Sequence, residues 1–164
     1  MAGIYLRACE FIFNAETKAM INIRQKGANA EREVVNMLNG LAIDARKQRG
    51  LPALDKQDLP VQRNPLQAAI GGGDITNPFG FDIEVKNCAQ LSINTWWKQC
   101  TASAERSGGT PVLMYKVARK GWRVVMMTDI EDMTVIAEIS KEAFLDIAER
   151  RIVEYYESRE HKPW

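Results

Sequence analysis

Four charged residues could together carry out metal-assisted hydrolysis: Glu31, Asp74, Glu84 and Lys86. Carboxylate oxygens suit Mg²⁺, which usually binds one or two of them and keeps several waters. Bound Mg²⁺ can polarise a phosphate and lower the pKa of an attacking water. In an extended strand Lys86 lies on the same face as Glu84, where its ammonium can orient that water. These residue types indicate phosphodiester hydrolysis with Mg²⁺ as the cofactor and Mn²⁺ as a substitute.

The scarcity of histidine and cysteine excludes other chemistries. His161 is the only histidine, so a zinc site built from several histidines is excluded and a Ser-His-Asp triad is disfavoured. Cys9, Cys88 and Cys100 are odd in number, so we expect no disulfide framework and a cytoplasmic location. The apolar runs are too short to span a bilayer. We expect neither a membrane partner nor an organic cofactor.

Charge is distributed unevenly along the 164 residues, although the net charge is only +1. Residues 1–128 contain 17 Lys and Arg against 11 Asp and Glu, whereas residues 129–164 contain 5 against 10. A basic body can attract a polyanion such as DNA, because neutralised phosphates release their counterions. A solvated surface with an acidic terminal helix explains the same counts equally well.

The spacing of apolar residues predicts alternating helices and strands. Residues 24–40 have helical periodicity with Gly40 as a stop signal, and the polar residues 44–58 are typical of a loop. Gly71, Gly72 and Gly73 form a hinge before Asp74. Further elements are expected at residues 61–63 (strand), 81–87 (strand), 92–106 (helix), 110–117 and 122–128 (strands), and 140–158 (helix).

These elements predict an α/β fold with a mixed central β-sheet flanked by helices and the catalytic residues at one edge of the sheet. We expect one domain over residues 1–164. Its core would cover about residues 20–128, residues 1–19 would be an N-terminal extension, and residues 140–158 an acidic C-terminal helix. Met20 would also make a sensible start, so the role of residues 1–19 stays open.

The helical and strand periodicities also orient the candidate site residues. At about 100° per residue, Glu31 lies at the margin of the apolar helix face that includes Val34, while Arg32 points almost opposite. The side chain of Glu31 can therefore point towards the sheet. Asp82 shares the strand face of Glu84 and is either an auxiliary metal ligand or an ordinary strand charge.

Three motifs, in order over about residues 20–128, resemble the archaeal-type Holliday junction resolvases of the PD-(D/E)xK nuclease superfamily. The first is the opening helix KGANAEREV at residues 26–34, and the second is Asp74 with the Glu-Val-Lys of residues 84–86. The third is GGTPVL at residues 108–113, followed by GWR at residues 121–123. The resemblance implies a restriction-endonuclease-like fold.

The resemblance also implies roles for single residues. Asp74 and Glu84 would bind the metal with the Val85 carbonyl, Glu31 would complete the site, and Lys86 would position the water. The residues implied or suspected to contact DNA are Lys26, Arg32, Arg46, Lys47, Arg49, Arg63 and Gln99. Residues 41–60 are longer than the family's connection, so Arg46, Lys47 and Arg49 either contact DNA arms or lie in a solvated loop.

The resemblance implies a homodimer that resolves branched DNA by paired, symmetric nicks. Of the adjacent Trp96 and Trp97, one is expected to pack on the sheet and the other to lie at the dimer interface or to stack on bases. Trp122 is expected in the core. Two alternatives remain: a nuclease of this superfamily acting on duplex, flap or single-stranded DNA, and an inactive nucleic-acid-binding module.

Overall fold

The computed structural model describes residues 2–65, 67, 72–117, 119–130 and 133–160, with side chains omitted for residues 2–22, 130 and 160. Gly71 and His161, both considered above, lie outside the described residues. The helices and strands are α1 (Ala2–Gln48), η1 (Lys56–Asp58), β1 (Gln62–Arg63), β2 (Ile75–Thr76), β3 (Phe81–Lys86), α3 (Ile93–Ser107), β4 (Thr110–Val117), β5 (Gly121–Ile130), β6 (Met133–Ser140) and α4 (Lys141–Glu160).

The six strands form one mixed sheet in the order β1-β2-β3-β4-β5-β6. Strands β3 and β4 pair in parallel, with α3 as the crossover between them, and every other neighbouring pair is antiparallel. The predicted fold class, a mixed sheet flanked by helices, is confirmed.

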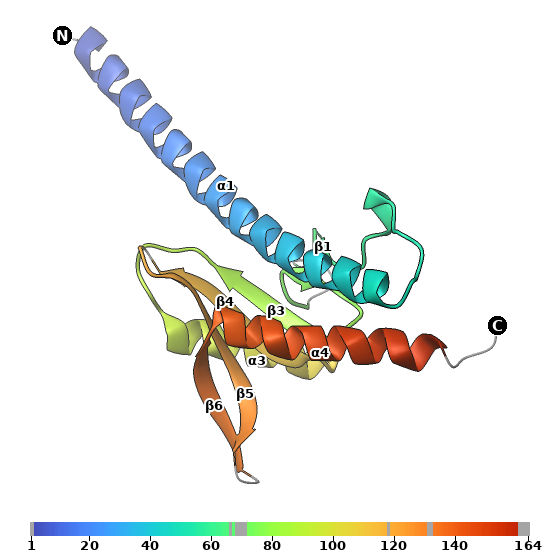
Figure 1. The fold of residues 1–164 in the computed structure, drawn as a ribbon. Helices are drawn as coiled ribbons and strands as arrows, with labels where there is room; N and C mark the ends of the chain where they lie inside the picture. The colour runs from blue at the N-terminus through green and yellow to red at the C-terminus, as the bar shows by residue number, and fades with distance from the viewer. Residues whose placement is uncertain (1, 66, 68–71, 118, 131–132, 161–164) are drawn as a thin grey trace.

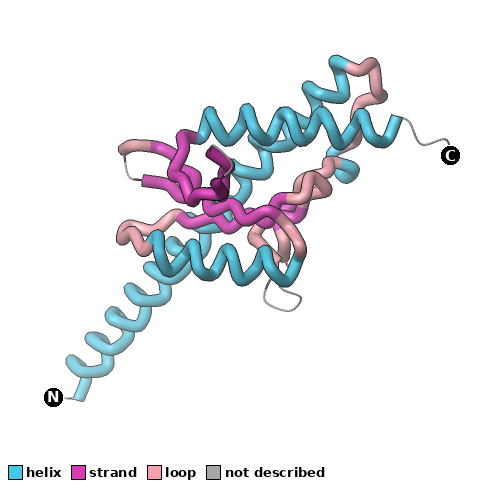
Figure 2. The backbone as a smooth tube through the Cα atoms, turned by 90° about the horizontal axis from the view of Figure 1, so that it is seen from below, coloured by secondary structure: helices cyan, strands magenta, loops and turns pink. Residues whose placement is uncertain are grey.

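Helices cover both faces of the sheet (Figure 2). Helices α1 and α4 lie against one face, and the larger hydrophobic cluster includes buried residues of both together with residues of β3, β4 and β5. Helix α3 lies on the other face, where Trp96 and Cys100 pack with Leu113, Tyr115 and Val125. Strand β3 is consequently enclosed on both faces, which places its charged residues in a largely dry environment.

Helix α1 is longer than predicted at both ends, and its N-terminal part projects away from the sheet (Figure 1). Gly40 does not end the helix, because the buried Ala42 and Ala45 continue its apolar stripe against the core. Residues 44–48, predicted as part of a loop, therefore belong to α1. Tertiary packing overrides a weak local stop signal here.

The C-terminal part of the described chain belongs to the same packed body. Strand β6 was not predicted, and β5 extends to Ile130 because it pairs with β6 along its length. Helix α4 contributes Phe144, Ala148, Ile152 and Tyr156 to the larger cluster. This helix is acidic only on its outer surface. Among the described residues, no helix is long and apolar enough to cross a membrane.

Candidate active site

The approach of the chain before β2 to β3 places Asp74. A Cβ atom on Gly73 would lie 2.5 Å from the Ile83 carbonyl oxygen, so only glycine fits there. The Asp74 N–H then donates to that same carbonyl at 2.7 Å, and Ile75 pairs with Ile83. Glycine at position 73 therefore allows Asp74 to lie beside the middle of β3.

The carboxyl group of Asp74 is surrounded by other charged groups. Its Oδ2 accepts a hydrogen bond from the Val85 N–H at 2.7 Å. Burial raises the pKa of Asp74 to about 6; the negative charges of Glu84 and Glu31 also raise this pKa, while the Val85 hydrogen bond and Lys86 lower it. Glu84, Lys86 and Glu31 all lie close enough to Asp74 to affect its pKa, and their common function in a site stays a prediction.

Glu84 and Lys86 form an ion pair on the face of β3 that looks towards α3. Glu84 is buried and its other oxygen accepts a hydrogen bond from Gln67 at 3.2 Å. Burial alone would lower the pKa of Lys86, but its hydrogen bond and attraction to Glu84, helped by Asp74, raise this pKa overall. Lys86 therefore carries a positive charge at neutral pH.

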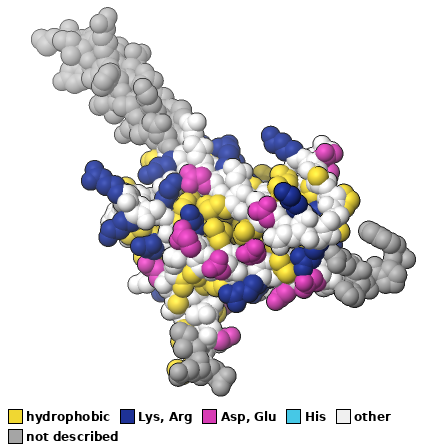
Figure 3. All heavy atoms as spheres, in the orientation of Figure 1, with side chains coloured by type: hydrophobic (Ala, Val, Ile, Leu, Met, Phe, Trp, Pro, Cys, Tyr) yellow, Lys and Arg dark blue, Asp and Glu magenta, His cyan; other side chains and the backbone are white. Residues whose placement is uncertain are grey.

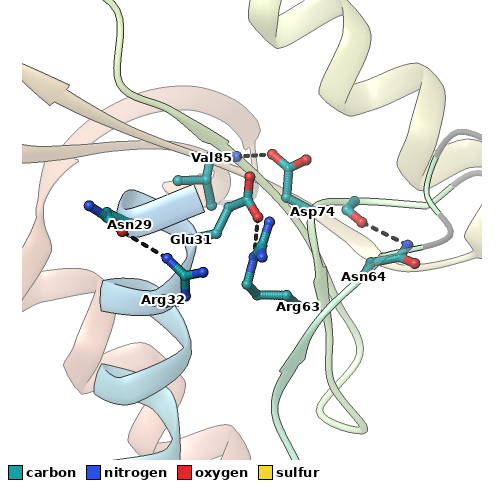
Figure 4. A network of polar contacts seen from close by, with 8 residues as sticks. Asn29, Glu31, Arg32, Arg63, Asn64, Asp74 and Val85 are labelled. Atoms are coloured by element: carbon teal, nitrogen blue, oxygen red, sulfur yellow. Dashed lines mark hydrogen bonds and ion pairs between the residues drawn. The ribbon is translucent and has the colours of Figure 1, made fainter. Parts of the chain in front are cut away.

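Glu31 reaches the same region from α1 (Figure 4). Its Oε2 accepts a hydrogen bond from Arg63 Nε at 2.5 Å, and the side chain is 20% exposed. Arg32 instead is exposed and donates to the Asn29 side chain at 2.7 Å. The helical geometry predicted for Glu31 and Arg32 is confirmed.

The residues present fit a divalent cation held by two carboxylates. Asp74 and Glu84 lie close enough for one to raise the pKa of the other, and a cation would relieve this repulsion. Among the described residues, however, no three Asp, Glu, His or Cys side chains converge as metal ligands. The expected convergence of three carboxylates on one ion is therefore not formed, because Glu31 is held by Arg63.

Asp82 is oriented differently from Glu84, although the two share a strand face. Its Oδ2 accepts hydrogen bonds from Ser107 at 2.6 Å and Ser103 at 3.2 Å, both on α3. Its Oδ1 is the only buried side-chain N or O atom without a partner among the described residues. These contacts attach the end of α3 to β3, which is a structural function.

The basic residues expected near residues 46–49 lie far from Asp74. Lys47 is sixteen residues after Glu31 on α1, or about 24 Å along the helix axis. Arg46 donates to the Pro52 carbonyl and lies over the Tyr156 ring, and Arg49 pairs with Glu157. Arg46 and Arg49 therefore attach the end of α1 to its surroundings rather than forming a free basic loop.

The residues expected on α3 are divided between core and surface. Trp96 is buried and Trp97 is half-buried against the same cluster, so both pack towards the sheet to different degrees. Gln99 is exposed and makes no contact with Glu84 or Lys86 that the structure records. Trp122 is buried in the larger cluster as predicted.

Two residues near the site were not predicted. Gln67 contacts Glu84. Asn64 donates two hydrogen bonds next to the glycines: its N–H donates to the Asp74 carbonyl and its side-chain amide to the Gly73 carbonyl at 3.0 Å. Neither residue belongs to a recognisable motif. Asn64 could have been suspected from its position directly after a predicted strand, whereas no sequence signal indicates Gln67.

Among solved structures, this chain is similar to Hjc of Archaeoglobus fulgidus, a Holliday junction resolvase from an archaeal hyperthermophile. The two are 19% identical, the match covers 75% of this chain and 95% of Hjc, and the TM-score is 0.41. No curated protein matches the chain significantly.

The sequence also matches a protein family described as "Phage putative PDDEXK endonuclease" over residues 22–161. This match includes every candidate site residue, as well as β6 and α4, which the sequence motifs did not reach. It begins after the projecting N-terminal part of α1. The predicted relationship to PD-(D/E)xK nucleases is confirmed, and this chain belongs to the phage PDDEXK endonuclease family.

Proposed function

We propose that this protein is a Mg²⁺-dependent DNA endonuclease whose site is formed by Asp74, Glu84 and Lys86, with Glu31 beside them. The observation that carries this proposal is the hydrogen bond from the Val85 N–H to Asp74 Oδ2 at 2.7 Å, which holds this carboxylate beside the residue between Lys86 and the buried Glu84. Carboxylate oxygens are the ligands that Mg²⁺ prefers, and burial together with the negative charge of Glu84 raises the pKa of Asp74 to about 6.

Asp74 and Glu84 would hold the metal, and a bound Mg²⁺ would supply polarisation of the scissile phosphate and activation of a water. The Val85 N–H fixes the orientation of the Asp74 carboxylate by donating to Oδ2. Lys86, which is paired with Glu84 and stays charged, would donate a hydrogen bond to the water or to a phosphate oxygen. Arg63, 41% exposed and paired with Glu31, is positioned to contact the substrate backbone.

For the substrate we propose a four-way DNA junction cut by paired nicks in a homodimer. The support is the resemblance of residues 26–34, 74 with 84–86, and 108–113 to the Holliday junction resolvases. Recognition would then depend on the branched shape and on phosphate positions rather than on base edges. The alternative with the same site is cleavage of linear duplex, flap or single-stranded DNA.

The deciding experiment compares a synthetic four-way junction with linear duplexes of the same sequence, with Mg²⁺, with Mn²⁺ and with EDTA. We expect symmetric nicks in the junction, slower cutting of the duplexes and no cutting with EDTA. Equal rates on both DNAs would refute the junction proposal and leave a general endonuclease. Absence of cutting on every DNA in both metals would refute the enzymatic proposal.

A further inference from the structure

A cleft of about 550 Å³ opens where β3 ends, directly beyond Lys86. Its lining residues come from α1, from the segment after β3 and from the turn between β4 and β5: Lys26, Asn87, Cys88, Ala89, Lys116, Val117, Arg119 and Gly121. A smaller hollow of about 350 Å³ shares Lys26 and Asn87 and continues along α1 past Asn29 and Glu33. The two hollows adjoin at Lys26 and Asn87 and together form a path from the β4–β5 turn along α1 to Glu33.

The lining of this path is positively charged. Both oxygens of Glu33 accept hydrogen bonds from Lys116, at 2.9 and 2.8 Å, and one also accepts from Trp122. The hydrogen bond from Lys116 holds the pKa of Glu33 below its usual value, so these two charges offset each other. Lys26 and Arg119 are exposed, and neither has a carboxylate partner among the described residues.

The face of the molecule drawn in Figure 3 carries Lys and Arg side chains. Lys and Arg side chains gather on the side of the body where the β4–β5 turn lies, below the projecting helix. A local excess of positive charge raises the concentration of a polyanion near the surface and speeds its association.

Arg119 has an unusual backbone conformation for its residue type. Its φ is 63°, in the left-handed region that glycine and asparagine adopt more readily. The turn is closed by a hydrogen bond from the Lys120 N–H to the Val117 carbonyl at 3.1 Å, and the next residue, Gly121, also has positive φ. Arg119 lines the cleft and its side chain is exposed, so this turn adds a positive charge to the wall of the cleft.

We propose that this cleft binds the sugar-phosphate backbone of the DNA strand next to the scissile phosphate, with Lys26 and Arg119 as its phosphate contacts. Asn87 lines both hollows and directly follows Lys86, so the cleft begins at the end of β3, one residue beyond the proposed site. Contacts to phosphates carry no base information, so the cleft sets the register of the strand and not a sequence preference. This inference rests on the proposed nuclease function.

The test measures binding of a fluorescent four-way junction and of a linear duplex by anisotropy, with EDTA present so that no strand is cut. The double variant Lys26→Ala/Arg119→Ala removes both proposed contacts. The control Arg106→Ala/Arg150→Ala removes two exposed cations from α3 and α4 and leaves the same net charge. We expect the dissociation constant of the cleft variant to rise about tenfold, with a salt dependence weaker by about two phosphate contacts.

Equal losses of affinity in the cleft and control variants would overturn the proposal, because general attraction would then explain the binding. An unchanged dissociation constant in the cleft variant would also overturn it. Binding is measured apart from cleavage, so a wild-type protein that binds DNA but does not cut it contradicts only the proposed enzymatic activity. A wild-type protein that neither binds nor cuts DNA contradicts both.

A second variant separates a DNA contact from a folding function of the turn. Arg119→Gly removes the charge and relieves the left-handed strain, so thermal stability should be retained or increased. DNA affinity should nevertheless fall several-fold, whereas Arg119→Lys should retain most of it because it keeps a positive charge. Full affinity in Arg119→Gly would show that Arg119 serves only the turn and would overturn its assignment.

Discussion

Two carboxylates lie near β3 in contrasting surroundings. Asp82, buried at the start of the strand, accepts hydrogen bonds from Ser103 and Ser107 and thereby holds α3 against the sheet. Asp74, half-buried beside the middle of the strand, receives one backbone hydrogen bond and is repelled by Glu84 and Glu31. In the first environment, neutral hydroxyl donors bind one oxygen of the carboxylate. The second is unfavourable until a cation or a proton arrives.

The comparison teaches that burial alone does not distinguish a structural carboxylate from a functional one. The composition of the surroundings distinguishes the two. Hydroxyl donors from α3 stabilise the charge of Asp82, whereas the negative charges of Glu84 and Glu31 disfavour the charged form of Asp74. Perturbed acids in such surroundings are candidates for functional sites. Stability and activity should therefore respond in opposite ways when the two residues are changed.

The largest effect is expected for cleavage by Asp74→Asn. The amide oxygen can still accept from the Val85 N–H, but the charge that would hold the metal is lost, so the cleavage rate should fall by about a thousandfold or more. Thermal unfolding of the metal-free variant should show a gain on the order of 1–2 kcal/mol, because the repulsion with Glu84 disappears. Normal cleavage by a folded Asp74→Asn protein would refute the site.

Asp82→Ala should produce the reverse pattern. The hydroxyls of the buried Ser103 and of Ser107 lose their acceptor, so the free energy of unfolding should fall by about 2 kcal/mol. The cleavage rate per folded molecule should stay within about threefold of the wild type, since the hydrogen bonds that Asp82 accepts come from serines of α3 and not from residues of the proposed site. Urea unfolding combined with cleavage assays below the transition checks both. A loss of cleavage as large as that of Asp74→Asn would contradict the purely structural function of Asp82.

The pH dependence of metal-free stability should report Asp74. Its folded-state pKa of about 6 lies above the ordinary value of 3.8, so the folded state binds the proton more tightly. This group should thus add stability as pH falls from above 6 towards 4, and the gain should be lost as pH rises through 6. The contribution of Asp74 is measured as the difference between the free energies of unfolding of the wild type and of Asp74→Asn, determined by denaturation in EDTA at several pH values. Identical pH profiles for the two proteins would contradict the raised pKa.

The smallest effects are expected for two glycines, Gly40 and Gly73, where an added Cβ atom should change stability in opposite directions. Gly40 lies inside α1 with open space where a Cβ would be, so Gly40→Ala should stabilise the protein by about 0.5–1 kcal/mol. Gly73→Ala should destabilise it, because its Cβ would meet the β3 backbone beside Asp82. Thermal unfolding measures both changes. A stable, active Gly73→Ala protein would show that Asp74 does not depend on this close approach.

The sequence by itself predicted most of the secondary structure that surrounds the site. Strand β4 was expected at residues 110–117 and is found at those residues; β3 differs from expectation by one residue at its end, and α3 by one residue at each end. Strong periodicity and glycine turns made these elements predictable. Strand β6 was missed because its apolar residues are half-buried or exposed, and the end of α1 was missed because Gly40 is a local signal without tertiary information.

What the sequence determined alone is the set of residue types able to bind a metal and position a water: acidic residues at 31, 74 and 84 and a lysine at 86. Only the tertiary structure decided their partners, since Arg63 reaches Glu31 and the serines of α3 reach Asp82 across long sequence separations. Local spacing can orient a side chain on its own element. Which side chains meet depends on the packing of distant elements. That packing alone distinguishes the surroundings of Asp74 from those of Asp82.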